Sequence, residues 1–383
     1  MPIHFAVEEY AERRQQAAAA LAASGLDALL CFRQESMYWL SGYDTFGYCF
    51  FQCLVLRADG RMTLLTREPD RRQAQITSVI EDVRVWVDRE GVNPAEDLRD
   101  LLAELGLERA QLGIEYEAYG LTGRNARRLD AALSGFAESE DQSELISRLR
   151  VIKSPAEMAC IRRAAGLADD ALDAALARVG AGAFEGDILA DMQGAVFSGG
   201  GDYSGNEFII GSGATALLCR YQTDRRHLDA QDQLTLEWAG VYRRYHAAMM
   251  RTILVGDVHD EHRQMHAAAD EAMSACVEAC SPGRTCGDVF DAHARVIDAA
   301  GLRPHRLNAC GYAMGATFAP MWMDWPMFYT GNPVEIVPGM AFFIHIILMN
   351  SDSGRAMTLG QSVEVTEAGA ISLHRHDTSL LAG

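Results

Sequence analysis

The stretch Leu234-Thr-Leu-Glu-Trp-Ala-Gly-Val-Tyr-Arg-Arg-Tyr-His-Ala-Ala-Met-Met-Arg-Thr252 decides the fold of this chain. Its two arms are rich in β-branched, aromatic and long apolar residues, and the polar break between them suits a short turn. The pattern therefore predicts a β-hairpin that carries an acid, Glu237, into an apolar interior. With a turn centred on Tyr242 and Arg243, Glu237 lies directly across from Ala248, with Cβ atoms about 5 Å apart.

Length and composition point to two globular domains. The chain has 383 residues, more than one domain usually contains, and 49% of them are apolar, as in an ordinary globular protein. No apolar run approaches the roughly eighteen residues of a membrane span, and the charged start MPIHFAVEEYAERRQQ lacks the apolar core of a signal peptide. We therefore expect a cytoplasmic protein. The nine cysteines show no CxxC spacing, so we expect buried free thiols and no disulfides.

The net charge restricts the class of partner. At −19, the chain lacks the basic face that binding to nucleic acid or to an anionic membrane requires. The charge carries little information about a small-molecule substrate, and solubility explains most of it. We expect a small molecule as the ligand.

Short apolar runs alternate with helical patterns in the first part of the chain, which predicts an α/β domain over residues 1–150. A helix over residues 7–24 ends at Gly25, a typical C-cap glycine. Strands are predicted over 27–32, 49–57, 61–66, 83–87 and 111–114, helices over 70–77, 94–105 and 122–133, and further apolar runs lie at 37–40 and 136–138. No glycine-rich phosphate loop follows a strand, so nucleotide binding has no support.

The stretch Ile152-Lys-Ser-Pro-Ala-Glu157 marks the domain boundary, because it opens a long helix. Ser154 is the predicted N-cap, Pro155 takes the first helical position and Glu157 closes a capping box. The helix is expected to end at Gly180. Further helices are predicted from about 185 and over 260–280 and 286–300, with a strand at 207–210 and a last hairpin of 339–350 and 356–367. This pattern predicts an α+β domain over residues 151–383.

Five motifs in this order resemble the pita-bread superfamily of creatinase, aminopeptidase P and prolidase. They are the Ile-Lys-Ser-Pro-x-Glu linker, the 237–252 hairpin ending in Met-Arg-Thr, Gly311-Tyr-Ala-Met-Gly315, Pro338-Gly-Met340 and Val365-Thr-Glu367. The resemblance covers nearly the whole chain. It implies a creatinase-like α/β domain followed by a pita-bread catalytic domain, and it implies a homodimer.

The resemblance also implies where a metal centre would lie. Peptidases of this superfamily hold two metal ions with two Asp, one His and two Glu, because hard divalent ions need several oxygen or imidazole donors. This chain departs at all five positions, which are Glu237, Ala248, Tyr312, His345 and Gly360 in that order of ligands. An open catalytic site needs about three protein ligands, so we expect neither metal nor cofactor. With Glu237 across from Ala248 and His345 across from Gly360, we expect the vacated space to be a pocket.

Among metal-free relatives of this superfamily, the chain resembles the ectoine hydrolase branch more closely than creatinase. The resemblance rests on the hairpin acid followed by Ala-Gly-Val-Tyr and Arg-Tyr-His-Ala, on Cys310-Gly-Tyr312, on Trp39-Leu-Ser-Gly-Tyr-Asp44 and on Gln52-Cys53. Three positions depart from that branch. Arg220 stands where the branch has its catalytic histidine, Phe46 where it has a tryptophan and Gln361 where it has an acid.

Glu237 is the candidate centre of the chemistry. An acid between Leu236 and Trp238 has its pKa raised by burial unless a cation lies nearby, and buried acids without a partner are rare outside functional sites. Glu237 either attacks an electron-poor carbon or acts as general base to a water; both roles need the ionised form. The structural alternative is an ion pair with Arg251 or Arg220. Arg220 cannot accept a proton, so we expect a forked contact to a substrate carboxylate, or else a salt bridge to Asp202 or Glu237.

Other candidate residues lie at or near positions implied by the resemblance. His345 can titrate near neutrality and is a candidate acid or base, or else a core histidine. Tyr312 suits hydrogen-bond donation to a developing charge. His246 either shares the acid or base role or caps the turn, and Asp324 either pairs with a substrate amine or is a loop acid. Tyr245 and Gln361 complete the candidate substrate contacts in this domain.

An aromatic cluster in the N-terminal domain includes Tyr43, Phe46 and Tyr48, with Asp44 between them. Core packing explains these rings. In the superfamily that the chain resembles, however, the N-terminal domain of one subunit tends to cover the site of the other. An aromatic face over a cationic amidine is therefore the functional alternative for Tyr43, Asp44 and Phe46.

The sequence thus predicts a metal-independent hydrolase that cleaves a C–N bond in a small carboxylate-bearing amidine or amide, as in ectoine hydrolase and creatinase. Three alternatives stay open. They are a metal-dependent Xaa-Pro dipeptidase, a lyase of the dimethylsulfoniopropionate type, and a binding protein that kept the pocket without catalysis.

Overall fold

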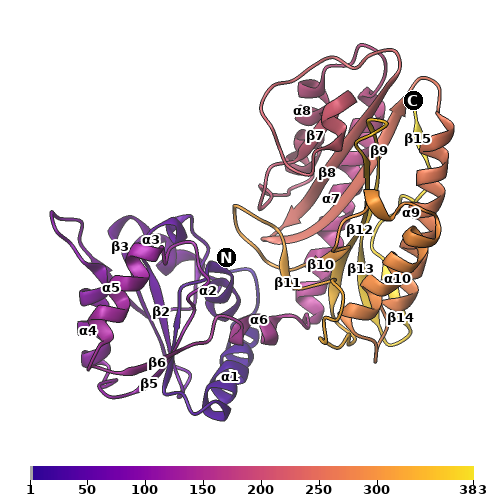
Figure 1. Cartoon of the computed structure of the whole chain (residues 1–383). Coiled ribbons are helices and arrows are strands. Elements are labelled where there is room, and N and C mark those ends of the chain that lie inside the picture. Colours follow the sequence, from indigo (N-terminus) through magenta and orange to yellow (C-terminus); the bar gives the residue numbers. More distant parts are fainter. Residues whose placement is uncertain (1–2) are drawn as a thin grey trace. The chain divides into compact units, whose positions relative to one another are not determined.

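The computed structural model of the protein describes residues 3–383. The chain divides into two compact units, Met1–Arg150 and Val151–Gly383 (Figure 1). Along the described residues, every helix is too short or too polar to cross a bilayer. The nine cysteines are free thiols, and Cys31, Cys53, Cys160 and Cys276 are buried.

The first unit is a mixed sheet with helices on both faces. The strand order is β4-β3-β2-β1-β5-β6, with β1 parallel to β5 and antiparallel to β2. Leu30 packs with the residues of α4 and α5 on one face, whereas its neighbour Leu29 packs with α1 and α2 on the other. The elements are α1 (Val7–Ala23), β1 (Ala28–Cys31), α2 (Gln34–Ser41), η1 (Gly47–Cys49), β2 (Cys53–Arg57), β3 (Met62–Arg67), α3 (Glu68–Thr77), β4 (Asp82–Trp86), α4 (Pro94–Glu104), β5 (Gln111–Ile114), α5 (Gly123–Leu133), β6 (Glu138–Asp141) and α6 (Leu145–Arg150). The predicted α/β architecture is confirmed.

The structure assigns one apolar run that the pattern left open and moves one predicted strand boundary. The apolar run 37–40 lies inside helix α2, because an eight-residue helix buried on every side shows no amphipathic period. The strand predicted from residue 49 begins only at Cys53, since Gly47–Cys49 forms a 3₁₀ turn. Apolar residues alone cannot separate such a turn from the strand that follows it.

The second unit begins with the predicted helix. Helix α7 (Pro155–Arg178) has Ser154 as its N-cap: Glu157 N donates to Ser154 Oγ at 3.2 Å, and Ser154 N donates to Glu157 Oε2 at 2.9 Å. This helix packs closely on the first hairpin. A Cβ at Gly240 would clash with the carbonyl oxygen of Ala164, so only glycine permits this approach.

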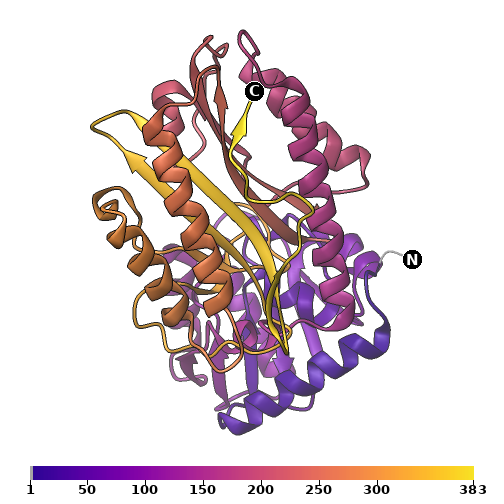
Figure 2. The same ribbon diagram turned by 90° about the vertical axis from the view of Figure 1, so that its right-hand side faces the viewer.

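The sheet of the second unit has the strand order β11-β10-β12-β13-β9-β8-β7. Helices α7 and α8 pack on the β8–β9 part and helices α9 and α10 on the β12–β13 part, all on the same side of the sheet (Figure 2). The elements are α8 (Glu185–Ser198), β7 (Ile209–Ser212), η2 (Gly213–Leu217), β8 (Asp232–Tyr242), β9 (Tyr245–Val255), α9 (Asp260–Ala279), α10 (Cys286–Ala299), η3 (Arg303–His305), β10 (Gly311–Ala313), β11 (Asp324–Met327), β12 (Ala341–Asn350), β13 (Arg355–Thr366), β14 (Gly369–Ser372) and β15 (Leu381–Ala382). The predicted α+β class is confirmed.

The β8–β9 hairpin is present, but its predicted register is wrong. Tyr242 pairs with Tyr245, so the turn consists of Arg243 and Arg244, which have φ values of 51° and 68°. Two successive positive φ values are those of a type I′ turn, which matches the twist of the two strands. Arginine rarely adopts this conformation. The turn also lacks the asparagine and glycine that usually indicate it, so the sequence pattern did not predict its position. As a result Glu237 pairs with Met250, and Ala248 pairs with Ala239.

Candidate active site

One cross-strand row brings the two long hairpins together. Glu237 pairs with Met250, Met250 with Gly360, and Gly360 with His345. Paired residues of neighbouring strands share a face of the sheet, so Glu237 and His345 lie on the same face. The predicted pairing of His345 with Gly360 is confirmed. This face is opposite the one that the helices cover, because the core residues Leu236 and Ile344 alternate with Glu237 and His345.

Tyr312 reaches Glu237 from the far part of the same sheet. Tyr312 lies on β10 and pairs with Phe343, whereas Glu237 lies on β8, four strand spacings away. At about 4.8 Å per strand, a flat sheet would separate the two backbones by roughly 19 Å. The two side chains nevertheless lie close enough for Tyr312 to lower the pKa of Glu237, and for the charge of Glu237 to raise the pKa of Tyr312. The sheet must therefore curl, and Glu237 and Tyr312 face each other across its concave side.

Glu237 is a buried acid whose charge is only partly compensated. Its side chain is 8% exposed, and burial raises its pKa to about 7. The positive charge of Arg220 and the side chain of Tyr312 act in the opposite direction. A carboxyl group with this pKa is substantially ionised at neutral pH and can still accept a proton, which suits a general base or a nucleophile.

Tyr312 is held as a neutral hydrogen-bond donor. The indole Nε1 of Trp322 donates to the Tyr312 hydroxyl at 2.8 Å, which leaves the phenolic proton for Glu237. Burial, together with the negative charge of Glu237, raises the pKa of Tyr312 well above its ordinary value. The hydroxyl therefore keeps its proton across the physiological range, as the predicted role requires.

His345 lies in a cluster of three aromatic rings beside this pair. The ring centroids of His345, Phe343 and Tyr312 are 5.5 to 5.7 Å apart. Burial lowers the pKa of the His345 imidazole to about 3, and the charges of His293 and Arg220 add to this effect. His345 is thus neutral at pH 7. Such an imidazole is a poor proton shuttle, so the lowered pKa and the ring contacts favour a packing role over the predicted acid or base role.

Arg220 supplies the positive charge of the site. It lies between η2 and β8, its side chain is exposed, and its Nη1 donates to the carbonyl of Cys219 at 2.7 Å. Its charge lowers the pKa of Glu237 and acts on Tyr312 and His345 as well. The guanidinium is therefore close to the concave face and accessible to a solute.

The residues at the family's metal positions do not fit a dinuclear centre. Ala248 and Gly360 offer no side-chain donor, and within residues 3–383 no group of three or more His, Cys, Asp or Glu is arranged to hold a metal ion. The expected vacant space at Gly360 is also filled. A Cβ there would lie 2.7 Å from Phe343 Cζ and 2.8 Å from Met250 Cβ, so Phe343 and Met250 occupy the place of a ligand side chain. A pocket in the rest of the space between the two hairpins stays a prediction.

Gln361 and Arg251 lie on the opposite face of the sheet from Glu237. Gln361 pairs with the core residue Ile344, and its Oε1 accepts from Ser372 Oγ at 3.2 Å. The predicted substrate contact of Gln361 at the Glu237 site is therefore wrong, because residues alternate between faces along a strand. For the same reason Arg251, next to Met250, cannot pair with Glu237.

Two further candidates are engaged in structural contacts. The Tyr245 hydroxyl donates to Glu157 Oε1 at 2.7 Å, at the start of α7. Both ring nitrogens of His246 are bonded, Nε2 to Gly205 N at 2.8 Å and Nδ1 to Thr317 Oγ1 at 3.1 Å, and burial lowers its pKa to about 4. These bonds favour the structural alternative for His246 over catalysis.

Asp324 is a buried residue of β11 rather than a loop acid. It pairs with Ala313, its Oδ1 accepts from Trp325 N at 2.9 Å, and its charge acts on His246. A Cβ at Gly315 would lie 2.6 Å from Asp324 Oδ2 and 3.5 Å from Lys153 Nζ. Asp324 therefore lies on the strand next to β10, near the buried residue Lys153.

The aromatic candidates of the first unit differ in exposure. Tyr43 is fully buried, its hydroxyl donates to Gln52 Oε1 at 3.2 Å, and burial raises its pKa. The backbone N–H of Asp44 donates to Thr77 Oγ1. Phe46 is 69% exposed and contacts the ring of Tyr48 at 5.6 Å between centroids. Core packing thus explains Tyr43, whereas a role of Phe46 over the site of a second copy stays a prediction.

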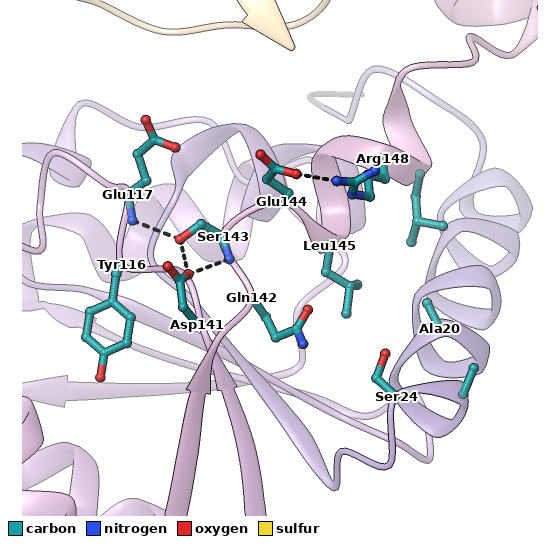
Figure 3. A pocket seen from close by; sticks show the side chains of 12 residues that line it. Ala20, Ser24, Tyr116, Glu117, Asp141, Gln142, Ser143, Glu144, Leu145 and Arg148 are labelled. Atoms are coloured by element: carbon teal, nitrogen blue, oxygen red, sulfur yellow. Dashed lines mark hydrogen bonds and ion pairs between the residues drawn. The ribbon is translucent and has the colours of Figure 1, made fainter. Parts of the chain in front are cut away.

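A cavity of about 950 Å³ lies within the first unit and contains none of the predicted site residues (Figure 3). Four of its polar side chains are bonded in two pairs. Ser143 Oγ donates to Asp141 Oδ1 at 2.5 Å, and Arg148 pairs with Glu144. This arrangement resembles a satisfied surface groove more than a reactive site.

Two site residues escaped the sequence analysis. Trp322 orients Tyr312, but it lies in a segment whose sequence shows no regular period. Phe343 fills the space beside Gly360. Its position could have been predicted, because residues two apart on a strand share a face, so Phe343 lies beside His345.

Comparisons with known proteins agree with this architecture. Residues 13–152 match the creatinase/prolidase N-terminal domain, and residues 159–367 match metallopeptidase family M24. The ectoine hydrolase of Halomonas elongata is 28% identical over 96% of both chains, and the probable dipeptidase PepE of Mycobacterium tuberculosis is 28% identical over 97% of this chain and 96% of its own. The crystal structure of dipeptidase PepE from Mycobacterium ulcerans superposes with a TM-score of 0.85, at 26% identity and 99% coverage of both chains.

A recombinant prolidase from Thermococcus sibiricus shares the fold as well, with a TM-score of 0.86 over 98% of this chain and 99% of its own, at 19% identity. The predicted resemblance to the pita-bread superfamily is thereby confirmed. With a creatinase/prolidase N-terminal domain followed by a family-matching catalytic unit, the chain belongs to metallopeptidase family M24, a family of hydrolases.

Proposed function

We propose that this protein is a metal-independent hydrolase that cleaves a C–N bond, in a cyclic amidine or an amide, of a small carboxylate-bearing substrate. The observation that carries the proposal is the buried pair of Glu237 and Tyr312. Burial gives the carboxyl group a pKa of about 7, and its partner is a tyrosine that stays protonated. Such a pair can accept one proton and donate one hydrogen bond without a metal ion.

In the proposed reaction, ionised Glu237 takes a proton from water while the hydroxide oxygen bonds to the electron-poor carbon. The C–N bond then breaks, and the leaving nitrogen takes the proton back from Glu237. Direct attack by Glu237, followed by hydrolysis of the resulting acyl or imidate intermediate, is the alternative with the same products. Tyr312 donates to the negative charge that develops during attack, and Arg220 binds the substrate carboxylate through its forked guanidinium.

The substrate class draws support from the ectoine hydrolase of Halomonas elongata, which is similar along nearly the whole chain. The donor set supports it independently, since Ala248 and Gly360 cannot serve a metal-dependent peptidase. A second candidate function is dipeptide hydrolysis. It is favoured by the equal identity of the probable dipeptidase PepE, and it requires either a metal site or a use of Glu237 on a peptide bond.

A labelled-water assay tests the proposal. Chelator-dialysed protein is incubated in H₂¹⁸O with ectoine, hydroxyectoine, creatine and a set of Xaa-Pro dipeptides, and the products are analysed by mass spectrometry. We expect one ¹⁸O atom in the product of a solute substrate, no cleavage of dipeptides, and loss of product with Glu237→Gln. Dipeptide cleavage that appears only after manganese or cobalt is added would establish the second candidate. An unlabelled product would indicate a lyase.

A further inference from the structure

The two long hairpins of the second unit meet at a short seam between β9 and β13. Pairing in the β8–β9 hairpin is continuous along its whole length, but the seam pairs only Leu359 with Arg251 and Gly360 with Met250. Side-chain hydroxyls continue the contact on either side. Ser362 Oγ accepts from Ala248 N at 2.9 Å and donates to Ala248 O at 3.0 Å, and Thr358 N donates to Thr252 Oγ1 at 2.9 Å. The seam therefore depends on side chains more than the hairpins do.

Arg251 lies at this seam, on the face that the helices cover. Its residue is 2% exposed, and its Nη1 donates to the carbonyls of Met250 at 2.9 Å and Gly360 at 2.5 Å. These two carbonyls belong to the seam pair in the row that joins Glu237 to His345. Arg251 thus ties β9 to β13 directly behind the site.

The burial of this cation is costly. Within residues 3–383, the hydrogen bonds of the Arg251 guanidinium all end on carbonyl oxygens, and its Nε has no partner. Burial lowers its pKa to about 10, although the negative charges of Asp169 and Asp377 act in the opposite direction. A buried charge whose hydrogen bonds all go to neutral groups is destabilising compared with an apolar side chain. A gain in fold stability is therefore a weak explanation for Arg251.

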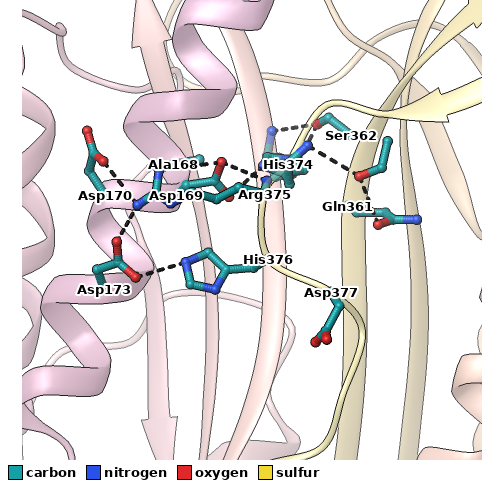
Figure 4. Close-up of polar contacts among 12 residues, drawn as sticks. Ala168, Asp169, Asp170, Asp173, Gln361, Ser362, His374, Arg375, His376 and Asp377 are labelled. Carbon is teal, nitrogen blue, oxygen red and sulfur yellow. Dashed lines mark hydrogen bonds and ion pairs between the residues drawn. The ribbon is translucent and has the colours of Figure 1, made fainter.

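A C-terminal strap, residues 373–383, holds Arg251 from behind. The strap runs between α7 and α9 (Figure 2), and the carbonyl of Asp377 accepts from Arg251 Nη2 at 3.2 Å. Figure 4 shows its anchors on α7: Arg375 pairs with Asp169, Asp170 and Asp173, and His376 Nε2 lies 2.9 Å from Asp173 Oδ1. Beyond them, Leu381 pairs with Ile253 of β9.

We propose that Arg251 is a positioning residue for the Glu237 site and that the strap keeps it in place. Glu237 lies on β8, on one side of the seam, whereas Tyr312 and His345 lie on β10 and β12, on the other side. The distance between Glu237 and Tyr312 consequently depends on how β9 and β13 are held. Arg251 fixes this spacing by bonding to both strands at the row of the site.

The catalytic consequence rests on the proposed function, but the positioning has a readout that needs no substrate. Tyr312 lowers the pKa of Glu237, so a looser seam that moves Tyr312 away should raise that pKa. We would measure it by ¹³C NMR titration of Glu-labelled protein, in the wild type and in Arg251→Lys. Lysine keeps the charge but lacks the fork that reaches both strands.

We expect the pKa of Glu237 in Arg251→Lys to rise by on the order of 1, the size of one lost hydrogen bond to a charged group. For any substrate found, kcat should fall between about 10-fold and 100-fold while KM changes little, because the loss is one of alignment. Guanidinium ion added to Arg251→Ala should restore both values in part, and methylammonium should not. A merely structural arginine would give none of these results.

Arg375→Gln decides the question if the Arg251 variants do not fold. It removes the anchor of the strap at an exposed position and should raise the pKa of Glu237 by less than Arg251→Lys does. Arg178→Gln is the matched control, because Arg178 also pairs with an acid, Asp191, and has a side chain 46% exposed like that of Arg375, but this ion pair lies on α7 and α8 and not on the strap. The pKa of Glu237 in Arg178→Gln should equal the wild-type value.

The outcomes separate the two proposals. An unchanged pKa of Glu237 in a folded Arg251→Lys protein, or in Arg375→Gln when Arg251→Lys is unfolded, overturns the positioning role. If the pKa moves as expected but neither the wild type nor any variant turns over a solute, the positioning stands and the proposed function fails.

Discussion

The side chains of Tyr312 and Glu237 lie close enough for Tyr312 to lower the pKa of Glu237, although they lie on strands β10 and β8 of one sheet, with three strands between them. This contact is possible because the sheet curls, and it joins the two hairpins on the concave face. It couples the charge state of the acid to the position of a tyrosine on the other hairpin. Three of the predictions below concern this pair.

The first prediction concerns pH. If ionised Glu237 is the reactive form, kcat/KM should rise with pH and level off above an apparent pKa of about 7, the value that burial gives this group. In Arg220→Gln the removal of a positive charge should shift this pKa upward, because Arg220 lowers it. A pH–rate profile of both proteins measures the shift. An activity that is independent of pH between 5 and 9 would contradict a role for Glu237 as base or nucleophile.

The second prediction concerns Tyr312→Phe. Loss of the hydroxyl removes a group that favours the ionised acid, so the pKa of Glu237 should rise and kcat at pH 7 should fall. The indole N–H of Trp322 loses its acceptor, which should cost about 1–3 kcal/mol of unfolding free energy. Urea unfolding and the pH–rate profile measure the two effects. Trp322→Phe is the control that removes the indole N–H and keeps the tyrosine.

The third prediction concerns stability in Glu237→Gln. The pKa of Glu237 is about 7 in the folded protein and exceeds the ordinary value of 4.5. The contribution of the protonated carboxyl group to the unfolding free energy is therefore complete below pH 4.5 and is lost as pH rises through 7. The uncharged glutamine avoids this loss. At pH 8 the variant should therefore be more stable than the wild type by about 3 kcal/mol, and the difference should disappear near pH 4.5. Equal unfolding free energies of the variant and the wild type at both pH values would show that burial does not destabilise the ionised form of Glu237.

The fourth prediction tests the filled ligand position. Gly360→Ala should cost about 1–3 kcal/mol, since the new methyl group meets Phe343 Cζ at 2.7 Å and Met250 Cβ at 2.8 Å. Combining it with Phe343→Leu should recover part of the loss, because the ring no longer occupies the space. Thermal unfolding of the two single variants and the double variant measures the coupling. Strictly additive losses would mean that Phe343 is not what excludes a side chain at this position.

The sequence predicted the elements whose signals are local. The capping box at Ser154 and Glu157, the domain boundary beside it and the β12–β13 hairpin with its register follow from patterns of a few residues. The β8–β9 register was wrong by two residues, because the turn uses two arginines with positive φ instead of the usual glycine or asparagine. Residues two apart share a face, so Glu237 and Ala248 still lie on the same side of the sheet despite this error.

The site itself was only partly predictable. Glu237 and Tyr312 were identified as candidates, but their contact depends on the curl of the sheet, which has no signature in either strand. Gln361 was misplaced because its face is set by the long-range pairing of β13 with β12. The buried surroundings of His345 and His246, which set their pKa values, arise from segments that are distant in the sequence.

The central claim is that Glu237 drives hydrolysis without a metal ion. The most direct test is the turnover of chelator-dialysed wild-type protein and of Glu237→Gln on the solute found by the labelled-water assay. We predict full activity of the dialysed wild type, no stimulation by added manganese, cobalt or zinc, and a loss of at least about 100-fold in kcat/KM for Glu237→Gln. Activity that vanishes on dialysis and returns with a divalent metal, or a fully active Glu237→Gln protein, would contradict the claim.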